Sequence, residues 1–347
     1  MFNPRKILII RFSALGDLVL SSPIPRELKR VFPKSEITLL TSYGIGSVLV
    51  NNPHIDNYIF HNRKESFIEL SNLIRKLSKE KFELIYDAHR SIRSIWIVWN
   101  LSGFGLFKSP QVRSINKRSW QRSLLIRFKI NTLKNTPPQR QHLLVPLQEI
   151  TQIELQNHTE LFPNKDAVLS VKIFMENNKL LSNRFIAIGA SASYPLKCWP
   201  LANFRLLISD LVANGWPVVL VGDSNEKETT QLKQEYHGKI HNTAGIFSTL
   251  ESAELLRHAR LVVTNDTSVS HMAEAVNTPA IVIFGPTVRE FGYVPFLKES
   301  KLLETNEVLN CRPCSKDGRG KCRNTNHLQC LTTIKPQNVM QLIPELD

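Results

Sequence analysis

The sequence lacks the features that mark membrane-spanning and secreted proteins. No apolar run approaches the ~20 residues that a membrane-spanning helix needs, because charge or proline interrupts each one. Near the start, Arg5 and Lys6 precede only the apolar residues 7–10, and Arg11 ends this run before it could serve as a secretory core. The chain has 347 residues, of which 42% are hydrophobic. We therefore expect a cytoplasmic, globular protein of about two domains.

The chain also lacks the G-x-G-x-x-G fingerprint of dinucleotide binding. The first apolar run leads instead into R-F-S-A-L-G-D at residues 11–17, a glycine turn between a strand and a helix. This turn places Asp17 at the carboxyl end of the strand, the edge where α/β sheets bind ligands. Asp17 taken alone is better explained as a helix cap.

Strand-like and helix-like segments alternate in both halves of the chain, separated by a poorly patterned stretch around residues 150–183. We expect strands at 6–10, 36–40, 82–86, 185–189, 217–222, 261–263 and 279–284. Helices are expected at 17–32, 91–101, 201–214, 226–236 and 249–258. The alternation predicts an α/β fold with mostly parallel sheets. We expect an N-terminal domain at 1–165, a C-terminal domain at 180–335 and a terminal helix at 336–347.

The run N-D-T-S-V-S-H at residues 265–271 lies between a predicted strand and a predicted helix. The first N–H groups of a helix have no partner within it, and together with the helix dipole they favour a phosphate. Thr267 and Ser268 can add hydroxyl donors, and His271 lies in the first turn. An isolated D-T-S is better explained as a cap, but a second buried strand and its own turn, F-G-P-T, follow here.

Two further loops of the second half end predicted strands with polar residues. The first contains Ser191 and Ser193 and ends in K-C-W-P, where Lys197 can pair with a diphosphate as a point charge. The second, G-D-S-N-E at residues 222–226, carries carboxylates that can accept hydrogen bonds from ribose hydroxyls. Together these loops indicate a nucleotide site.

Acidic residues are absent from residues 108–142, although this segment carries nine lysine and arginine residues. The whole chain has a formal net charge of +14, which favours anionic partners. Because apolar residues are interleaved, a helix over 118–130 would be basic on one side and apolar on the other. Such a helix suits an anionic membrane surface. It suits equally well a solvated helix whose apolar stripe packs on its own domain.

Cysteine is scarce except near the C-terminus. Four of the five cysteines form the pattern C-x2-C-x7-C-x7-C, at Cys311, Cys314, Cys322 and Cys330. Because disulfides are rare in the cytosol, this spacing is compatible with a tetrahedral zinc or iron site of structural role. The alternative is a loop with unliganded thiols.

Four motifs together resemble those of the ADP-heptose:lipopolysaccharide heptosyltransferases, glycosyltransferase family 9. They are K-I-L-I-I-R-F-S-A-L-G-D-L-V-L-S-S-P-I at 6–24, K-C-W-P at 197–200, N-D-T-S-V-S-H at 265–271 and F-G-P-T at 284–287. Their order and spacing also match, and the resemblance covers about residues 6–340. It implies the GT-B fold, with two Rossmann-like domains facing across a cleft. The donor nucleotide would bind the C-terminal domain and the acceptor the N-terminal domain.

The resemblance also implies roles for single residues. Asp17 matches the aspartate of the family's G-D turn and is the candidate general base, and Lys197 matches the lysine before W-P. The family's diphosphate motif D-T-G-x-x-H falls on Asp266, Thr267, Ser268 and His271. Ser268 replaces a glycine, which slightly restricts the backbone. The other implied contacts are donor-side Ser191, Ser193 and Glu226 and acceptor-side Arg63, Lys64, Arg93 and His142.

The chemistry so implied is inverting glycosyl transfer without a catalytic metal or other cofactor. Asp17 would accept a proton from the acceptor hydroxyl while Lys197 and His271 stabilise the departing ADP. We expect transfer of a heptose or related sugar from an ADP-sugar to an anionic lipid-linked glycan such as Kdo-lipid A. This would occur at the inner face of the inner membrane.

Two alternatives stay open at this point. One is a nucleotide-sugar epimerase of the same two-domain architecture. The other is a basic nucleic-acid-binding protein built on a four-cysteine finger. Against the second, the basic residues cluster away from the cysteines in the sequence, and no recognised RNA- or DNA-binding motif occurs. We therefore expect no nucleic acid partner.

Overall fold

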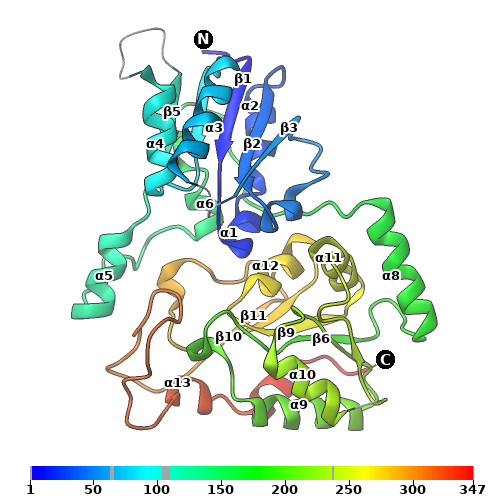
Figure 1. Cartoon of the computed structure of the whole chain (residues 1–347). Helices are drawn as coiled ribbons and strands as arrows, with labels where there is room; N and C mark the ends of the chain where they lie inside the picture. Colours follow the sequence, from blue (N-terminus) through cyan, green and yellow to red (C-terminus); the bar gives the residue numbers. More distant parts are fainter. Residues whose placement is uncertain (1, 63–65, 104–109, 237, 347) are drawn as a thin grey trace. The chain divides into compact units, whose positions relative to one another are not determined.

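The computed structural model describes residues 2–62, 66–103, 110–236 and 238–346, and the chain divides into two compact units (Figure 1). The first unit comprises Met1–Arg118 and Gln139–Phe162, and the second comprises Ser119–Pro138 and Pro163–Asp347. Residues 119–138, which the predicted division placed in the N-terminal domain, belong to the second unit. Among the described residues, no helix combines the length and apolarity that crossing a membrane requires.

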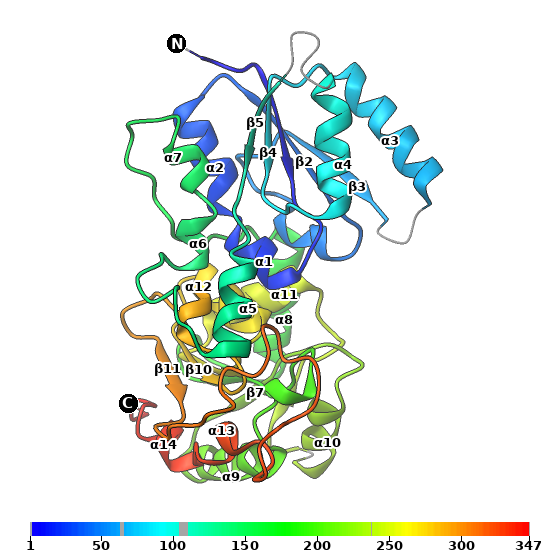
Figure 2. The same cartoon turned by 90° about the vertical axis from the view of Figure 1, so that its left-hand side faces the viewer.

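The first unit is built on a five-stranded parallel sheet of order β3-β2-β1-β4-β5. The strands are β1 (Lys6–Ile10), β2 (Glu36–Ser42), β3 (Asn57–His61), β4 (Leu84–Asp87) and β5 (Gln111–Ser114). Helices α3 (Phe67–Lys79) and α4 (Ile92–Leu101) cover one face, and α2 (Pro23–Val31) and α7 (Val145–Gln148) cover the other (Figure 2). Leu8 and Ile10 of β1 pack with Leu70 and Ile97 of the first pair of helices. Short helical segments complete the unit: α1 (Leu15–Leu20), η1 (Ile45–Leu49) and α6 (Gln139–His142).

The single helix predicted over residues 17–32 is wrong, because this segment forms the two helices α1 and α2. Pro23 begins α2, where its missing N–H would have no helical partner, and proline in a helix interior breaks the hydrogen-bond ladder. The break leaves α1 as a helix of six residues with Asp17 in its first turn.

The second unit is built on a six-stranded parallel sheet of order β11-β10-β9-β6-β7-β8. The strands are β6 (Ile186–Gly189), β7 (Val218–Leu220), β8 (His241–Asn242), β9 (Leu261–Asn265), β10 (Ala280–Phe284) and β11 (Lys301–Glu304). Counted from its own first strand, this is the order 3-2-1-4-5-6 of Rossmann folds. The predicted α/β class with parallel sheets is confirmed in both units.

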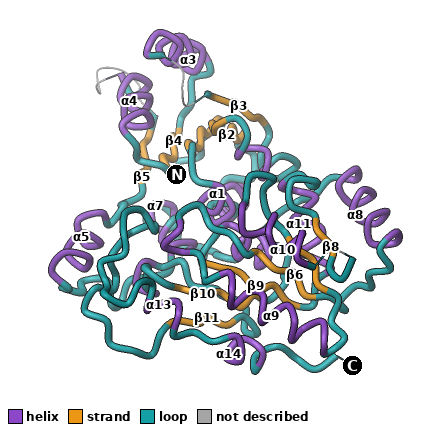
Figure 3. Tube along the Cα trace, turned by 60° about the horizontal axis from the view of Figure 1, so that its bottom comes forward, coloured by secondary structure: helices purple, strands orange, loops and turns teal. Residues whose placement is uncertain are grey.

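Helices lie on both faces of the second sheet. Helices α9 (Leu201–Ala213) and α14 (Pro336–Met340) lie together below the strands (Figure 3), and they bury Phe204, Leu207 and Val339 against β6, β7 and β10. The remaining helical segments are α5 (Ser119–Phe128), α8 (Lys165–Asn177), η3 (Pro195–Lys197), α10 (Lys227–Glu235), α11 (Thr249–His258), α12 (Ser268–Ala275), η4 (Arg289–Phe291) and α13 (Gln329–Thr332). Helix α8 falls within the stretch that appeared poorly patterned, although Asn164 caps its first turn by accepting from the N–H of Ala167.

Candidate functional site

Lys197 and Asp266 form a nearly buried ion pair at the carboxyl edge of the second sheet. The Nζ atom of Lys197 lies 2.7 Å from Oδ2 of Asp266 and also donates to the Asp266 carbonyl at 3.1 Å. The Thr287 hydroxyl donates to the same carboxylate at 2.8 Å. Of the two side chains, Lys197 is 16% exposed and Asp266 only 7%, so the lysine is the more exposed partner. The motifs K-C-W-P, N-D-T-S-V-S-H and F-G-P-T, recognised separately in the sequence, thus each contribute one residue to this cluster.

Helix α12 begins directly after this ion pair, with Thr267 as its N-cap. The Thr267 hydroxyl accepts from the N–H of Val269 at 3.3 Å, and Ser268 opens the first turn in a half-buried position. His271 is buried, and its ring centroid lies 6.1 Å from that of Tyr293. First-turn N–H groups and the dipole behind them make such a helix start favourable for a phosphate.

Asn265, which the sequence reasoning did not select, joins the loops of this edge. Its fully buried amide donates to the carbonyls of Ala190 and Ser191 at 2.8 and 3.2 Å. Its Oδ1 atom accepts from the N–H of Trp199 at 2.9 Å. The signal in the sequence was an amide side chain at the end of an apolar strand, directly before D-T-S. Asn265 therefore fixes the loop that carries Lys197.

The predicted nucleotide-side residues lie at the ends of β6 and β7. Ser191 is buried and its hydroxyl donates to Glu228 at 3.1 Å, whereas Ser193 is exposed. Burial raises the pKa of Glu226 above its ordinary value, although the Thr229 hydroxyl donates to this carboxylate at 3.0 Å. A Cβ atom on Gly222 would lie 2.0 Å from Oε2 of Glu226, so any larger residue at this strand end would displace the carboxylate.

In the first unit, Asp17 forms an ion pair with Arg11 at the carboxyl end of β1. The two side chains approach to 2.7 Å, and the Asp17 carboxylate also accepts from the N–H of Ala14 at 3.4 Å. Here the carboxylate is the exposed partner, at 23%, and the guanidinium is 6% exposed. Arg11 also donates to the Ala88 carbonyl, which joins the ends of β1 and β4.

Asp87, the other carboxylate at this edge, is buried and used within the fold. Its Oδ1 accepts from the N–H groups of His89 and Arg90 at 2.9 and 2.7 Å, and its Oδ2 accepts from the Ser94 hydroxyl at 3.0 Å. Burial raises the pKa of Asp87 above its ordinary value. Asp17 is thus the better placed of the two to meet a ligand.

Further basic and aromatic groups follow the strands of the first unit. Arg93 donates to Nε2 of His61 at 3.2 Å, and Nδ1 of His89 accepts from the N–H of Phe12 at 2.8 Å. The Phe12 ring lies 5.8 Å from that of His61 and 5.6 Å from that of His89. The two histidines were not selected from the sequence, although each lies at or just after the end of a strand. Arg63 and Lys64 lie outside the described residues.

His142 occupies a buried position in α6 with a partner on each ring nitrogen. Nδ1 accepts from Nη2 of Arg118 at 2.7 Å, and Nε2 donates to the Asn116 carbonyl at 2.5 Å. Because an arginine can only donate, these contacts require the neutral Nε2–H tautomer. Arg118 itself is buried. In this arrangement both side chains join α6 to the end of β5.

The helix expected within the basic segment is α5, and part of its apolar stripe packs on its own unit. Leu125 packs with Val288 and Phe291. The Arg122 guanidinium lies over the Phe291 and Tyr293 rings, at 5.7 and 5.5 Å. Trp120 and Phe128 are exposed. Lys108, at the start of the segment, lies outside the described residues.

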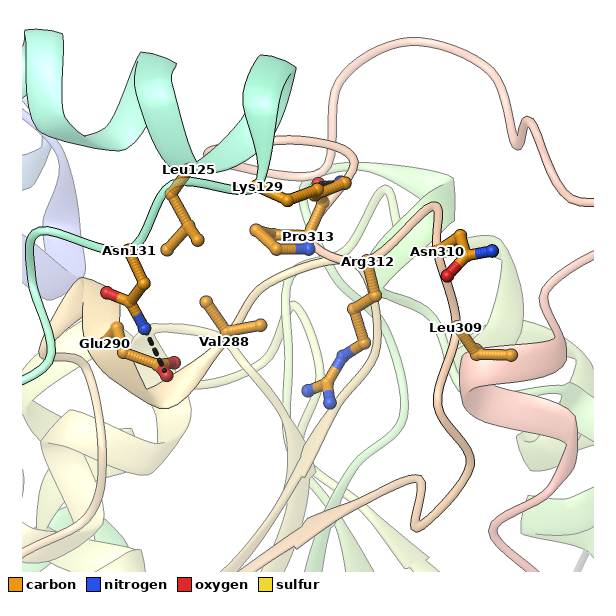
Figure 4. Close-up of a pocket in the computed structure, with 9 residues that line it drawn as sticks. All are labelled: Leu125, Lys129, Asn131, Val288, Glu290, Leu309, Asn310, Arg312 and Pro313. Atoms are coloured by element: carbon orange, nitrogen blue, oxygen red, sulfur yellow. Dashed lines mark hydrogen bonds between the residues drawn. The ribbon is translucent and has the colours of Figure 1, made fainter.

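A cavity of about 350 Å³ opens below α5 (Figure 4). The residues that line it are Leu125, Lys129, Asn131, Val288, Glu290, Leu309, Asn310, Arg312 and Pro313. Its two cations are engaged in the fold: Lys129 donates to the carbonyls of Cys311 and Pro313, and Arg312 pairs with Glu304 at 2.6 Å. The Asn131 amide points to Glu290, at 3.0 Å. The cavity therefore offers no anion site comparable with that at Lys197.

The four clustered cysteines converge on a second, much smaller cavity, of about 10 Å³. All four line it, and none forms a disulfide. As the side chains stand, no group of three or more His, Cys, Asp or Glu residues within the described ranges is arranged to hold a metal ion.

The carboxyl edges of the two sheets thus differ in their chemistry. The second unit presents a supported ammonium beside a helix start, which suits a phosphate or diphosphate. The first presents a partly exposed carboxylate held by an arginine, with histidines nearby. A carboxylate of this kind can accept a proton from a hydroxyl.

Comparison with known proteins identifies the family of the chain. Residues 70–323 match the profile of glycosyltransferase family 9 (heptosyltransferase). Lipooligosaccharide heptosyltransferase 2 of Haemophilus influenzae is 24% identical over 363 residues, covering 98% of this chain and 99% of that protein. A family 9 glycosyltransferase from Veillonella parvula matches with a TM-score of 0.78 at 17% identity, over 98% of this chain and 96% of the other. The ADP-heptose heptosyltransferase II structure from Escherichia coli has a TM-score of 0.71 at 20% identity, over 97% of both chains.

Proposed function

This chain belongs to glycosyltransferase family 9, and on that premise we propose that it transfers a heptose or a related sugar from an ADP-sugar to an anionic glycan acceptor such as Kdo-lipid A. Its relatives are named for heptose transfer in lipopolysaccharide or lipooligosaccharide synthesis. The observation that carries the proposal is the Lys197 ammonium beside the start of α12, held by the Asp266 carboxylate, which in turn accepts from the Thr287 hydroxyl.

We propose that this edge binds the diphosphate of the donor. Lys197 supplies a positive charge, and the N–H groups around Thr267 and Ser268 supply hydrogen-bond donors. Asp266 then acts by holding the ammonium in place, because its own carboxylate would repel phosphate oxygens. Glu226, Ser191 and Ser193 would lie on the nucleoside side, and His271 beside the diphosphate. No step of this arrangement uses a divalent metal.

On the acceptor side, we propose that Asp17 is the general base. The attacking hydroxyl oxygen forms a bond to the anomeric carbon of the donor and gives its proton to Asp17. The bond between that carbon and the diphosphate oxygen breaks, and ADP departs with the electron pair, so the anomeric configuration inverts. Arg11 orients the carboxylate, and Arg93, with Arg63 and Lys64 as further candidates, would contact the anionic acceptor. His142, whose two ring nitrogens bond to Arg118 and Asn116, would support this side only from within the fold.

A lipid-linked acceptor requires an enzyme that works at a membrane surface, and α4 has a suitable face. Ile92, Ile95, Trp96 and Trp99 lie at the spacing of one helical stripe and are 87%, 50%, 42% and 51% exposed. Indole rings favour the membrane interface. The neighbouring α3 (Figures 1 and 2) carries the exposed cations Arg75, Lys76 and Lys79, which favour anionic head groups. We propose that α4 docks on the anionic cytoplasmic leaflet.

Ligand binding and product release test the transfer proposal directly. ADP should raise the melting temperature of the protein, whereas UDP or a duplex oligonucleotide should not. With ADP-heptose and Kdo-lipid A, ADP should be released only when both substrates are present. Stabilisation by UDP alone, with interconversion of UDP-sugars, would favour the epimerase. Stabilisation by the oligonucleotide alone would favour a nucleic-acid-binding protein.

The membrane proposal is tested by vesicle binding. Exchange of Trp96 and Trp99 for serine should reduce sedimentation with vesicles that contain phosphatidylglycerol, while the response to ADP is unchanged. The matched control is Trp120→Ser, which removes a similarly exposed indole, at 60%, from α5. If only the Trp120 variant lost binding, α5 would be the docking helix. Equal binding of all variants would reject both surfaces.

A further inference from the structure

The loop that carries four cysteines, residues 311–330, encloses a cavity large enough for one ion and little else. Its volume of about 10 Å³ is roughly that of one water-sized sphere. Cys311, Cys314, Cys322 and Cys330 all line it, and the three apolar neighbours are Leu196, Pro286 and Leu328. Thiols from four points of one loop therefore share a single small, partly apolar chamber.

Hydrogen-bond donors lie near two of these sulfur atoms, and one cation, Arg323, lines the same cavity. The N–H of Leu328 lies 3.3 Å from Sγ of Cys322, and the Asn324 amide lies 3.7 Å from Sγ of Cys311. The loop contains a single acidic residue, Asp317, but five basic residues: Arg312, Lys316, Arg319, Lys321 and Arg323. Neutral thiols need no such surroundings, whereas a divalent metal with four thiolates carries a net charge of −2, which these groups would stabilise.

We propose that this loop binds one zinc or ferrous ion through four thiolates, those of Cys311, Cys314, Cys322 and Cys330. Four thiol protons are released as the four metal–sulfur bonds form, and no electron transfer is needed. Because the sulfur atoms are not yet in metal-binding geometry, binding must draw them to about 2.3 Å from the ion, which couples metal binding to the packing of the loop.

The same loop packs against the residues around Lys197. A Cβ atom on Gly318 would lie 2.8 Å from Cγ of Lys197, and φ at Gly318 is +90°, so both space and backbone require glycine there. Arg319 donates to the Tyr194 hydroxyl at 3.0 Å and lies 5.2 Å from the centre of that ring. Arg312 donates to the Thr287 carbonyl at 2.9 Å.

These contacts define a structural role for the proposed metal site. By closing the loop, the metal would hold Gly318 and Arg319 against the segment that carries Lys197. Part of the proposal rests on the proposed function, namely that this segment binds the donor diphosphate. The existence of the metal site does not rest on it. We therefore expect loss of the metal to weaken ADP binding as well as lower the melting temperature.

The decisive measurement is the metal content of the full-length protein purified without added metal or chelator. Elemental analysis should find about one zinc plus iron per chain, and iron would also show thiolate-to-iron absorption. Cys314→Ser and Cys322→Ser should lose the metal. The matched control is Cys198→Ser, which removes the one cysteine outside the loop and should retain it.

A second measurement covers variants that fail to fold. Cobalt added to chelator-treated wild-type protein should produce the sulfur-to-cobalt absorption of a tetrahedral thiolate site, and zinc should abolish it. Wild-type protein that holds neither metal, shows no such absorption with cobalt and has all four loop thiols titrating freely would overturn the proposal. Metal bound at full occupancy with unchanged ADP affinity after its removal would keep the site and overturn its link to Lys197.

Discussion

Both sheets end in a cation and a carboxylate 2.7 Å apart, but opposite members of the two pairs reach the surface. In the first unit the acid, Asp17, is 23% exposed and its arginine 6%. In the second unit the lysine is 16% exposed and its acid, Asp266, 7%. The first pair therefore presents a proton acceptor and the second a positive charge, and the buried partner in each case orients the exposed one. One kind of ion pair is thus proposed to serve two chemical tasks.

The two pairs also differ in how they are held. Arg11 and Asp17 belong to a single turn, so one stretch of chain determines their geometry. Lys197 and Asp266 lie 69 residues apart in sequence and join two turns, which Asn265 links a second time through Trp199 and Ala190. Damage to the second pair should therefore disturb the fold as well as the chemistry, whereas damage to the first should affect mainly chemistry.

The largest effect is expected at Asp17. Asp17→Asn keeps the shape of the side chain but removes the proton acceptor, so transfer should fall by roughly 10²–10⁴-fold, as for other positioned general bases. The affinity for ADP should change little. The melting temperature should fall only modestly, because the asparagine oxygen can still accept from the buried Arg11 guanidinium. The measurement is kcat on a verified acceptor, together with calorimetric titration of ADP.

Asp87→Asn is the matched control for this variant, because Asp87 is a carboxylate at the same edge that is used by His89, Arg90 and Ser94 within the fold. It should lower the melting temperature and leave turnover of the folded enzyme close to normal. The reverse pattern, with turnover kept in Asp17→Asn and lost in Asp87→Asn, would transfer the role of the base to Asp87.

A smaller effect on activity, combined with a larger one on stability, is expected at Lys197. Lys197→Ala should weaken ADP binding by roughly 10- to 100-fold, since hydrogen bonds to charged groups contribute about 1.5–3 kcal/mol. It also leaves the Asp266 carboxylate buried without its partner, which typically costs about 3–5 kcal/mol of stability. Calorimetric titration of ADP and denaturant unfolding measure the two effects separately.

The double variant Lys197→Met with Asp266→Asn separates these effects further. It removes both charges, so stability should recover while ADP binding stays weak. If ADP binding recovered together with stability, Lys197 would act only by supporting the fold, and the comparison between the two edges would fail.

The two parallel sheets and the polar strand ends could be predicted from the sequence. The spacing of apolar residues, the glycine turns and the helix caps that indicate them each lie within a short stretch of chain. The sequence pattern predicts a helix at residues 249–258, for example, and α11 has these bounds. The missed features depend on distant partners. The role of Asn265 appears only when residues 190 and 199 fold beside it, and His61 and His89 gain meaning only when β3 and β4 end near Phe12. The break between α1 and α2 had a local cause, Pro23, that could have been read from the sequence.

The smallest effect is expected at Glu226, and it depends on pH. Below the usual glutamate pKa of about 4.3, the carboxyl is protonated in both folded and unfolded chains. Burial raises the pKa of Glu226 in the folded protein. As the pH rises, the unfolded chain therefore loses this proton first. Between the unfolded and the folded pKa, the folded protein becomes progressively less stable relative to the unfolded chain. Glu226→Gln has no ionisable carboxyl at this position, so this loss of stability does not occur in the variant. Its melting temperature relative to the wild type should therefore increase between about pH 4 and neutrality.

Thr229→Val provides a control of opposite sign, since it removes the hydroxyl that donates to the Glu226 carboxylate at 3.0 Å. Its melting temperature should fall relative to the wild type over the same pH range. If Glu226 also accepts from the ribose, Glu226→Gln should weaken ADP binding at neutral pH by about fivefold, the difference between a charged and a neutral acceptor. A stability difference that does not vary with pH, with unchanged ADP affinity, would leave Glu226 with no role beyond that of the N-cap residue of α10. The nucleoside would then have to be bound by other groups of the second unit.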